Sequence, residues 1–153
     1  MAEKIVIGCD NAAVTYRDEI KQMLLHLGYD VVDVGVDSQT SPTFYPYVAE
    51  AAAKEIQKDP DNIRGILICG TGIGMAMTAN KCKGIRAAVG HDSFSVERSR
   101  LSNDSNVLCM GARVIGIELA KMLTKQWLSL GHVTGASKDK VEAILEIERA
   151  NFK

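Results

Sequence analysis

Short runs of β-branched and other apolar residues alternate along the chain with longer segments in which apolar residues recur every three or four positions. The short runs are typical of buried strands, and the longer segments of amphipathic helices. The runs predict strands at residues 5–7, 31–34, 65–69, 85–89 and 106–110. The longer segments predict helices at about residues 16–27, 48–58, 75–81, 93–101, 115–130 and 138–149.

Strands that alternate with helices pair in parallel through right-handed crossovers. We therefore predict an α/β fold, a single Rossmann-like domain over residues 1–153 with a five-stranded parallel sheet in a three-layer α/β/α sandwich. Ligands of such sheets bind beyond the carboxyl ends of the strands. Glycines and polar residues crowd all of these ends, at residues 8–11, 35–37, 69–72, 90–92 and 110–113. The candidate site is expected at this edge.

The segment from Cys69 to Gly74, CGTGIG, follows the most apolar strand and opens a helix. Its glycines allow backbone N–H groups to point into a cavity, and the helix N-terminus adds partial positive charge, so the loop is suited to an anion. It is not the dinucleotide fingerprint, because Met75 stands where a third glycine is required, and no Gly-Lys-Ser/Thr follows as in a P-loop. The alternative is a tight strand-to-helix turn without chemistry.

The chain has four cysteines: Cys9, Cys69, Cys82 and Cys109. They form no C-x-x-C pair, and no histidine lies at a metal-ligand spacing from them, so no metal site is expected. Cys9, Cys82 and Cys109 are expected to be inert core thiols. Cys69 differs because it ends a strand beside oriented N–H groups, a setting that favours the thiolate as a nucleophile or a base.

Composition and charge narrow the function classes. Hydrophobic residues make up 46% of the 153 residues and charged residues 24%, which is ordinary for a globular protein. The net charge of −1 provides no basic field for nucleic acid, so a phosphate-bearing ligand needs a local site. No apolar run suits a signal peptide or the ~20 residues of a membrane span. A cytoplasmic, reducing setting without a membrane partner is the expectation.

Several motifs together resemble the ribose-5-phosphate isomerase type B family, which also contains the galactose-6-phosphate isomerase subunits. They lie at residues 8–10, 45–46, 68–74, 79–81, 84–88, 102–108 and 111–116, and the resemblance runs from residue 4 to about 149. It implies aldose–ketose isomerisation of a sugar phosphate through a cis-enediolate, without metal or organic cofactor. It also implies a homodimer, often paired into tetramers, with shared active sites and a C-terminal helix (about 138–150) packed on the partner subunit.

The resemblance also implies roles for individual residues. Cys69 moves the proton between C1 and C2, and Thr71 and the loop amides hold the enediolate oxygen. Some relatives carry a glutamate after the last loop glycine, but Met75 stands here, so Cys69 is the only candidate base. Asp10 is grouped with Cys69 and Thr71 among the catalytic residues, and Asn103 is supplied by the partner subunit. The residues expected to contact the substrate are Asp10, Asn11, Tyr45, Gly70, Gly72, Ile73, Gly74, Asn103, Arg113 and Lys140.

The chain departs from the family pattern at the ring-opening and phosphate positions. Asn11 and Ser102 replace two histidines, the second of which is credited with ring opening. Ala136 and Lys140 replace two phosphate-binding arginines, and lysine keeps the charge but loses the fork geometry. His91, at a neighbouring strand end, is a candidate to replace the ring-opening histidine, with Ser102 as a further auxiliary candidate. The alternative is that His91 is simply a polar residue with satisfied hydrogen bonds.

These departures leave the substrate open. A pentose 5-phosphate cyclises and needs ring opening, whereas a tetrose 4-phosphate has that oxygen esterified and stays open. Residues 91–98 and 101–103 also resemble the erythrulose-4-phosphate isomerases of the family. The alternatives are ribose 5-phosphate or another pentose phosphate, erythrulose 4-phosphate, a hexose phosphate, and a non-catalytic binding paralogue or hetero-oligomer subunit. A flavin or nucleotide binder has little support, because the required acidic residue and glycine spacing are absent.

Overall fold

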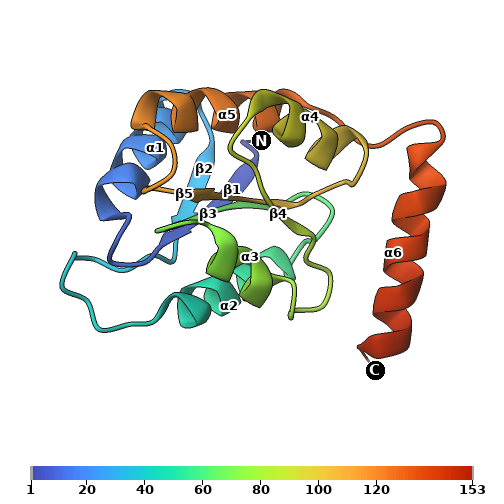
Figure 1. The fold of residues 1–153 in the computed structure, drawn as a ribbon, viewed down its shortest axis with the longest axis horizontal. Helices are drawn as coiled ribbons and strands as arrows, with labels where there is room; N and C mark the ends of the chain where they lie inside the picture. Colours follow the sequence, from blue (N-terminus) through green and yellow to red (C-terminus); the bar gives the residue numbers. More distant parts are fainter. Residues whose placement is uncertain (1, 153) are drawn as a thin grey trace.

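The computed structural model describes residues 2–152 and shows one five-stranded, all-parallel sheet (Figure 1). The strands are β1 (Lys4–Cys9), β2 (Asp30–Asp33), β3 (Arg64–Cys69), β4 (Ala87–Val89) and β5 (Val107–Gly111), in the spatial order β2-β1-β3-β5-β4. The helices are α1 (Val14–His26), α2 (Tyr45–Ile56), α3 (Ile73–Ala79), α4 (Ser93–Leu101), α5 (Ile117–Ser129) and α6 (Ser137–Asn151). The predicted α/β fold is confirmed.

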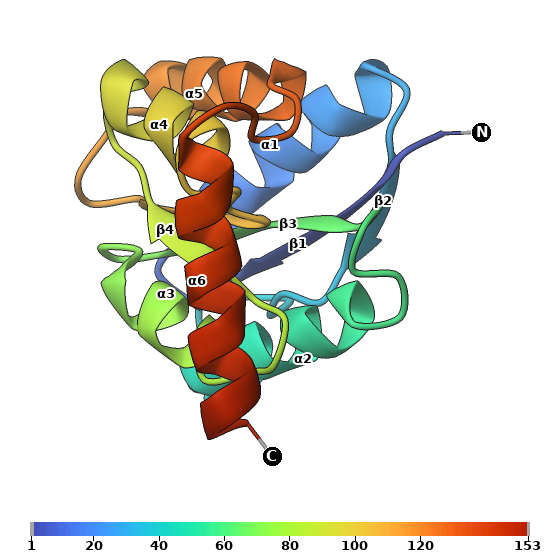
Figure 2. The ribbon, with the colours of Figure 1, turned by 90° about the vertical axis from the view of Figure 1, so that its right-hand side faces the viewer.

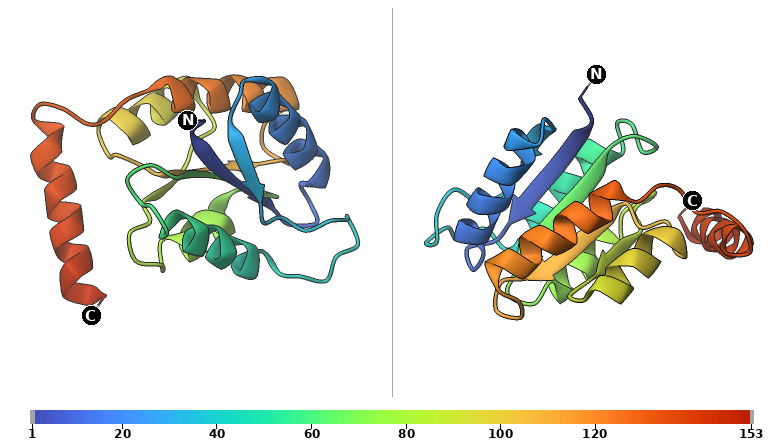
Figure 3. Two further views of the ribbon diagram at one scale, coloured as in Figure 1. Left: turned by 180° about the vertical axis from the view of Figure 1, so that it is seen from behind. Right: turned by 90° about the horizontal axis from the view of Figure 1, so that it is seen from above.

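The helices form two layers around the sheet. Helices α1, α4 and α5 cover one face and α2 and α3 the other, as Figures 1 and 3 show. Covered on both faces, the central strands consist almost wholly of buried residues, which is why they read as continuous apolar runs. The chain leaves β1 for β2 on one side and returns to β3 on the other, so the loops after β1 and β3 flank a topological switch point.

Most element boundaries differ from those predicted by one to three residues, and three of these differences illustrate how. Helix α2 begins at Tyr45 instead of residue 48, because Pro46 suits a first helical turn. Helix α3 begins at Ile73 instead of residue 75, directly after Gly72. Strand β4 spans only Ala87–Val89, because the backbone N–H of Arg86 donates to the Asn106 side chain, at 2.7 Å, in place of a ladder partner.

Helix α6 stands apart from both layers, beside the edge of the sheet that β4 forms (Figure 2). Val141 is its one buried side chain among the described residues, while Ile144 and Ile147 are 42% and 65% exposed. A carboxylate oxygen of Glu148 accepts a 2.7 Å hydrogen bond from the Gly84 N–H. The helix itself is confirmed, and its packing on a partner subunit stays a prediction. Within residues 2–152, no helix has the length and apolarity to cross a membrane.

Candidate active site

Cys69 is the last residue of β3 and lies directly under the loop that follows it. Its Sγ accepts a 3.1 Å hydrogen bond from the backbone N–H of Gly72, and the residue is 5% exposed. The amide dipole of Gly72 is thus aimed at the sulfur. The Cys69 side chain therefore points toward the glycine loop and keeps a small solvent-exposed area.

The other three cysteines lie in settings that favour the neutral thiol. Burial raises the pKa of Cys9 to about 12, and burial also raises the pKa values of Cys82 and Cys109. None of the three ends a strand beneath a glycine loop. The expectation that they are core thiols fits these surroundings.

The loop from Gly70 to Gly74 needs its small residues. Gly72 has φ +80°, and a Cβ on it would lie 2.9 Å from the carbonyl carbon of Met110. Gly111, at the end of β5, packs so closely that a Cβ there would lie 2.6 Å from the Cα of Thr71. The exposed Thr71 hydroxyl accepts from the Ile73 N–H at 3.3 Å. Two glycine-bearing strand ends thus meet and hold backbone dipoles beside the cysteine.

Arg113 brings a positive charge to the same loop. The backbone N–H groups of Ala112 and Arg113 donate to the carbonyls of Cys69 and Gly70, at 2.9 and 3.0 Å. A Cβ on Gly70 would lie 3.7 Å from Nη1 of Arg113, so the guanidinium covers the glycine directly. The exposed side chain can therefore bind an anion beside the glycine loop.

Tyr45 and Asp10 come from the two neighbouring segments. A Cβ on Gly74 would overlap the Tyr45 ring and lie 2.8 Å from its hydroxyl oxygen, so the phenol lies over the first turn of α3. The N–H of Asp10 donates to the carbonyl of Ile68 at 3.3 Å, and its carboxylate accepts from the Ala12 N–H at 3.0 Å. Asp10, Asn11 and residues 41–45 line a cavity of about 280 Å³.

His91 has a partner that the sequence did not reveal. Its Nε2 accepts a 2.8 Å hydrogen bond from the Gly111 N–H, and burial lowers its pKa. The lone pair is thus occupied, and the ring holds the turn that carries Arg113. This geometry gives no support to His91 as the substitute for ring opening, because its remaining nitrogen, Nδ1, carries the proton.

Asn103, Ser102 and Lys140 are not brought to Cys69 within one chain. Asn103 and Ser102 lie in the connection from α4 to β5, at the amino edge of the sheet, and the Ser102 hydroxyl accepts from Arg98 at 3.2 Å. Asn103 lines a cavity of about 490 Å³ beside α6, and Lys140 is exposed in the first turn of α6. That Asn103 reaches the active site of a partner subunit stays a prediction, and its distance from Cys69 within one chain agrees with it.

Residues 41–44 were missing from the predicted site, although they share a cavity with Asp10 and Tyr45. They follow β2 in a polar, turn-rich segment, and that loop position at the carboxyl edge was the available signal.

The model of a family described as Ribose/Galactose Isomerase matches residues 5–144. The chain belongs to the ribose/galactose isomerase family. This confirms the resemblance predicted from the motifs, and the enzyme class, an aldose–ketose isomerase, is confirmed with it.

Family members with close similarity have different substrates in their names. D-erythrulose-4-phosphate isomerase 2 of Mycolicibacterium smegmatis is 48% identical over 153 residues, covering 98% of this chain and 100% of that protein. Ribose-5-phosphate isomerase B of Escherichia coli is 40% identical, covering 96% and 97%. The crystal structure of ribose-5-phosphate isomerase B from Mycoplasma genitalium, with bound ribulose 5-phosphate, matches with a TM-score of 0.93 and 30% identity, covering 97% and 98%.

Proposed function

We propose that this family member interconverts the aldose and ketose forms of a short sugar phosphate, with Cys69 as the base. The observation that carries the proposal is the placement of the Cys69 sulfur beneath the glycine loop, 3.1 Å from the nitrogen of Gly72. Cys69, Thr71, Arg113, Asp10 and Tyr45 come from three strand ends and one helix start, and they surround one edge of the sheet. Each of these side chains has a role that such a reaction needs.

The reaction begins with loss of a carbon-bound proton. The Cys69 thiolate takes the proton from the carbon next to the carbonyl, and the electron pair moves onto the carbonyl oxygen to give an enediolate. The loop amides and the Thr71 hydroxyl stabilise this oxygen, each donor contributing on the order of 3 kcal/mol. A proton passes from the hydroxyl oxygen of the enediolate to the oxygen that was the carbonyl. The thiol then returns its proton to the adjacent carbon while the newly deprotonated oxygen becomes the carbonyl, which completes the exchange of aldose and ketose and regenerates the thiolate. A base of this kind accelerates the proton transfer by about 10²–10⁴-fold.

The substrate favoured by the site is an open-chain tetrose phosphate such as erythrulose 4-phosphate. Opening a furanose ring needs a group that exchanges protons near neutral pH, and histidine is the usual one. Positions 11 and 102 are Asn and Ser, and the lone pair of His91 is bound to the Gly111 N–H. The remaining histidines, His26 and His132, lie at the end of α1 and beyond α5. The name of the Mycolicibacterium relative agrees with this proposal.

Ribose 5-phosphate is the second candidate, because the Mycoplasma structure of the same fold holds ribulose 5-phosphate. Ribulose 5-phosphate is itself acyclic, so a site without a ring-opening group accepts this ketose more readily than its cyclic aldose. We also propose a homodimer, in which a second subunit brings Asn103 and Lys140 to the site that each chain alone leaves without them.

A substrate panel with matched variants tests the proposal. We expect kcat/KM for erythrulose 4-phosphate to exceed that for ribose 5-phosphate, and Cys69→Ala to lower kcat by about 10²–10⁴-fold. Cys82→Ala, at a half-buried thiol remote from the loop, is the control and should retain activity. Full activity of Cys69→Ala would refute the base assignment, and faster turnover of ribose 5-phosphate would refute the tetrose assignment. Binding without turnover of any sugar phosphate would favour the non-catalytic alternative.

A further inference from the structure

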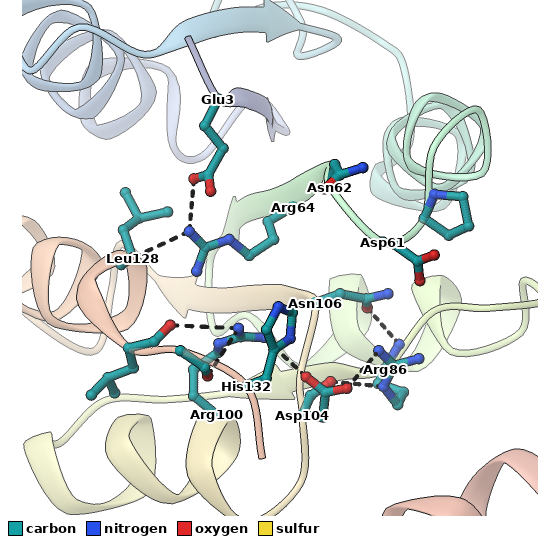
Figure 4. Close-up of a pocket in the computed structure, with 13 residues that line it drawn as sticks. Glu3, Asp61, Asn62, Arg64, Arg86, Arg100, Asp104, Asn106, Leu128 and His132 are labelled. Carbon is teal, nitrogen blue, oxygen red and sulfur yellow. Dashed lines mark hydrogen bonds and ion pairs between the residues drawn. The ribbon is translucent and has the colours of Figure 1, made fainter. Parts of the chain in front are cut away.

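A second polar cavity lies at the opposite edge of the sheet from Cys69, where the strands begin (Figure 4). It has a volume of about 300 Å³. Three arginines from separate segments line it: Arg64 opens β3, Arg86 precedes β4, and Arg100 lies in α4. His132, beyond the end of α5, adds an imidazole. None of these residues belongs to the site described above, and the family resemblance assigned them no role.

The arginines carry more charge than their carboxylate partners offset. Arg64 pairs with Glu3 at 2.7 Å, while Arg86 and Arg100 share Asp104, at 3.4 and 3.3 Å. Three guanidinium groups therefore have two paired carboxylates.

A third acid, Asp61, also lines the cavity, but it has no ion pair within residues 2–152. The pKa of Arg100 is lowered, first by burial and then by the charge of Arg64, with Arg86 acting in the same sense and Asp104 opposing. With Asp61 counted, three carboxylates formally balance the three arginines of the lining, so the attraction for an anion comes from unpaired guanidinium donors and not from a net charge.

Donor groups remain free on two of the arginines. Arg100 is committed to the framework, because it is 4% exposed and donates to the carbonyls of Ser105 at 2.6 Å and Gly131 at 3.2 Å. Arg86 donates to Asp104 through Nε and Nη2, and its Nη1 has no acceptor within the described residues. Nη1 of Arg64 reaches only the Trp127 carbonyl, at 3.4 Å. In Figure 4, Arg64 lies on one side of the opening and Arg86 and His132 on the other.

We propose that this cavity binds a phosphate group, either free or as the ester of a small metabolite, between Arg64, Arg86 and His132. Guanidinium groups match the oxygens of phosphate through paired, charge-assisted hydrogen bonds. The volume holds a phosphate with a short organic part. Asn62 and Asn106 also line the cavity and offer neutral polar groups to that part.

Binding here acts on a neighbouring loop. A phosphate on Arg86 competes with the Asp104 carboxylate, and Asp104 is the described non-glycine residue with positive φ, +52°. Asp104 directly follows Asn103, so an effect on turnover rests on the proposed role of Asn103 in the partner's site. Binding itself does not depend on that role, and the experiment therefore measures binding.

The test titrates inorganic phosphate into the full-length chain, followed by ³¹P NMR and by the shift in melting temperature. An Arg113→Ala background removes the phosphate contact at the glycine loop and leaves the second cavity intact. We expect binding to persist in this background. We expect it to weaken about tenfold or more in Arg86→Gln, which removes charge-assisted bonds, and in Asn62→Glu, which adds a carboxylate to the cavity.

His132→Ala should weaken binding by about threefold, since it removes one partly screened donor. This variant and Asn62→Glu change exposed side chains and keep the test decisive if Arg86→Gln unfolds. The matched control is His26→Ala, at an exposed histidine of α1, which should leave binding unchanged. A small ester that binds more tightly than phosphate would identify a metabolite as the ligand. Loss of all binding in Arg113→Ala, or equal binding in all the cavity variants, overturns the proposal.

Discussion

The carboxyl and amino edges of the same sheet hold their polar groups in different ways. Around Cys69 the donors are backbone N–H groups on glycine turns, with the guanidinium of Arg113 beside them. At the amino edge the donors are arginine side chains, fixed by carboxylates and by the last carbonyls of α5. Backbone dipoles cost little to keep desolvated and suit charge that appears transiently, whereas paired arginines brace the fold. Variants at the carboxyl edge should therefore reduce turnover, and variants at the amino edge should reduce the free energy of unfolding.

The largest expected effect is at the amino edge. Arg100→Met removes a buried guanidinium, leaves the Ser105 carbonyl without its partner and leaves Asp104 with Arg86 alone, which should cost about 3–5 kcal/mol of unfolding free energy. Urea unfolding measures the loss. The control is Arg98→Met on the same helix, where the ion pair with Glu97 is 41–42% exposed and should matter by less than about 1 kcal/mol. Equal losses in both variants would remove the distinction between the edges.

Gly72→Ala should lower kcat about a hundredfold. The alanine must adopt φ +80° and its Cβ meets the Met110 backbone, so the N–H that contacts Cys69 is displaced. Gly28→Ala is a matched control, because it has φ +93° and no atom within 4 Å of the added Cβ. Steady-state kinetics of both variants, measured at equal folded fraction, separate the loss of the loop donor from the general strain of alanine at positive φ. Retained kcat in Gly72→Ala would show that the loop donors are unimportant.

Gly74→Ala should raise KM about tenfold and leave stability nearly unchanged. The added methyl overlaps the Tyr45 ring, whereas alanine suits the helical backbone. A double variant with Tyr45→Ala tests whether the clash with the ring is the cause. Once the ring is absent, Gly74→Ala should add little to the rise in KM, so the two changes should be strongly non-additive. Additive effects on KM would mean that Gly74 acts through something other than the tyrosine.

The smallest expected effect is a pH dependence from His91. Its native pKa is lowered by burial, so its contribution to stability is present above the unfolded value of about 6.5 and is lost as pH falls through the native pKa. Protonated His91 no longer accepts from the Gly111 N–H, which should cost about 1 kcal/mol. Urea unfolding at pH 7.5 and 5 measures it. A His91→Gln variant with the same pH dependence as the parent would assign the effect elsewhere.

The fold and the cysteine were accessible to sequence reasoning because their signals are local. Alternating apolar runs located all five strands, and the position of Cys69 between a strand and a glycine loop indicated its surroundings. The bond of His91 to Gly111 was hidden because it joins residues 20 positions apart through the packing of β4 beside β5.

The arginines at the amino edge were hidden for a related reason. Arg64, Arg86 and Arg100 stand in three unrelated segments, each of which reads as an ordinary polar flank of a strand or helix. Only the strand order brings them together, and the sequence of a single segment does not determine the strand order. The late start of β4 was missed because the Asn106 side chain, from another part of the chain, accepts the N–H of Arg86.

Helix α6 has a consequence for how the protein should be assayed. Among its described residues it buries only Val141 against its own chain and leaves Ile144 and Ile147 exposed, an apolar surface that the proposed homodimer would cover. If the second copy also completes the catalytic pocket, the turnover per chain falls on dilution. Rates measured at nanomolar enzyme would then underestimate those in a concentrated cell extract.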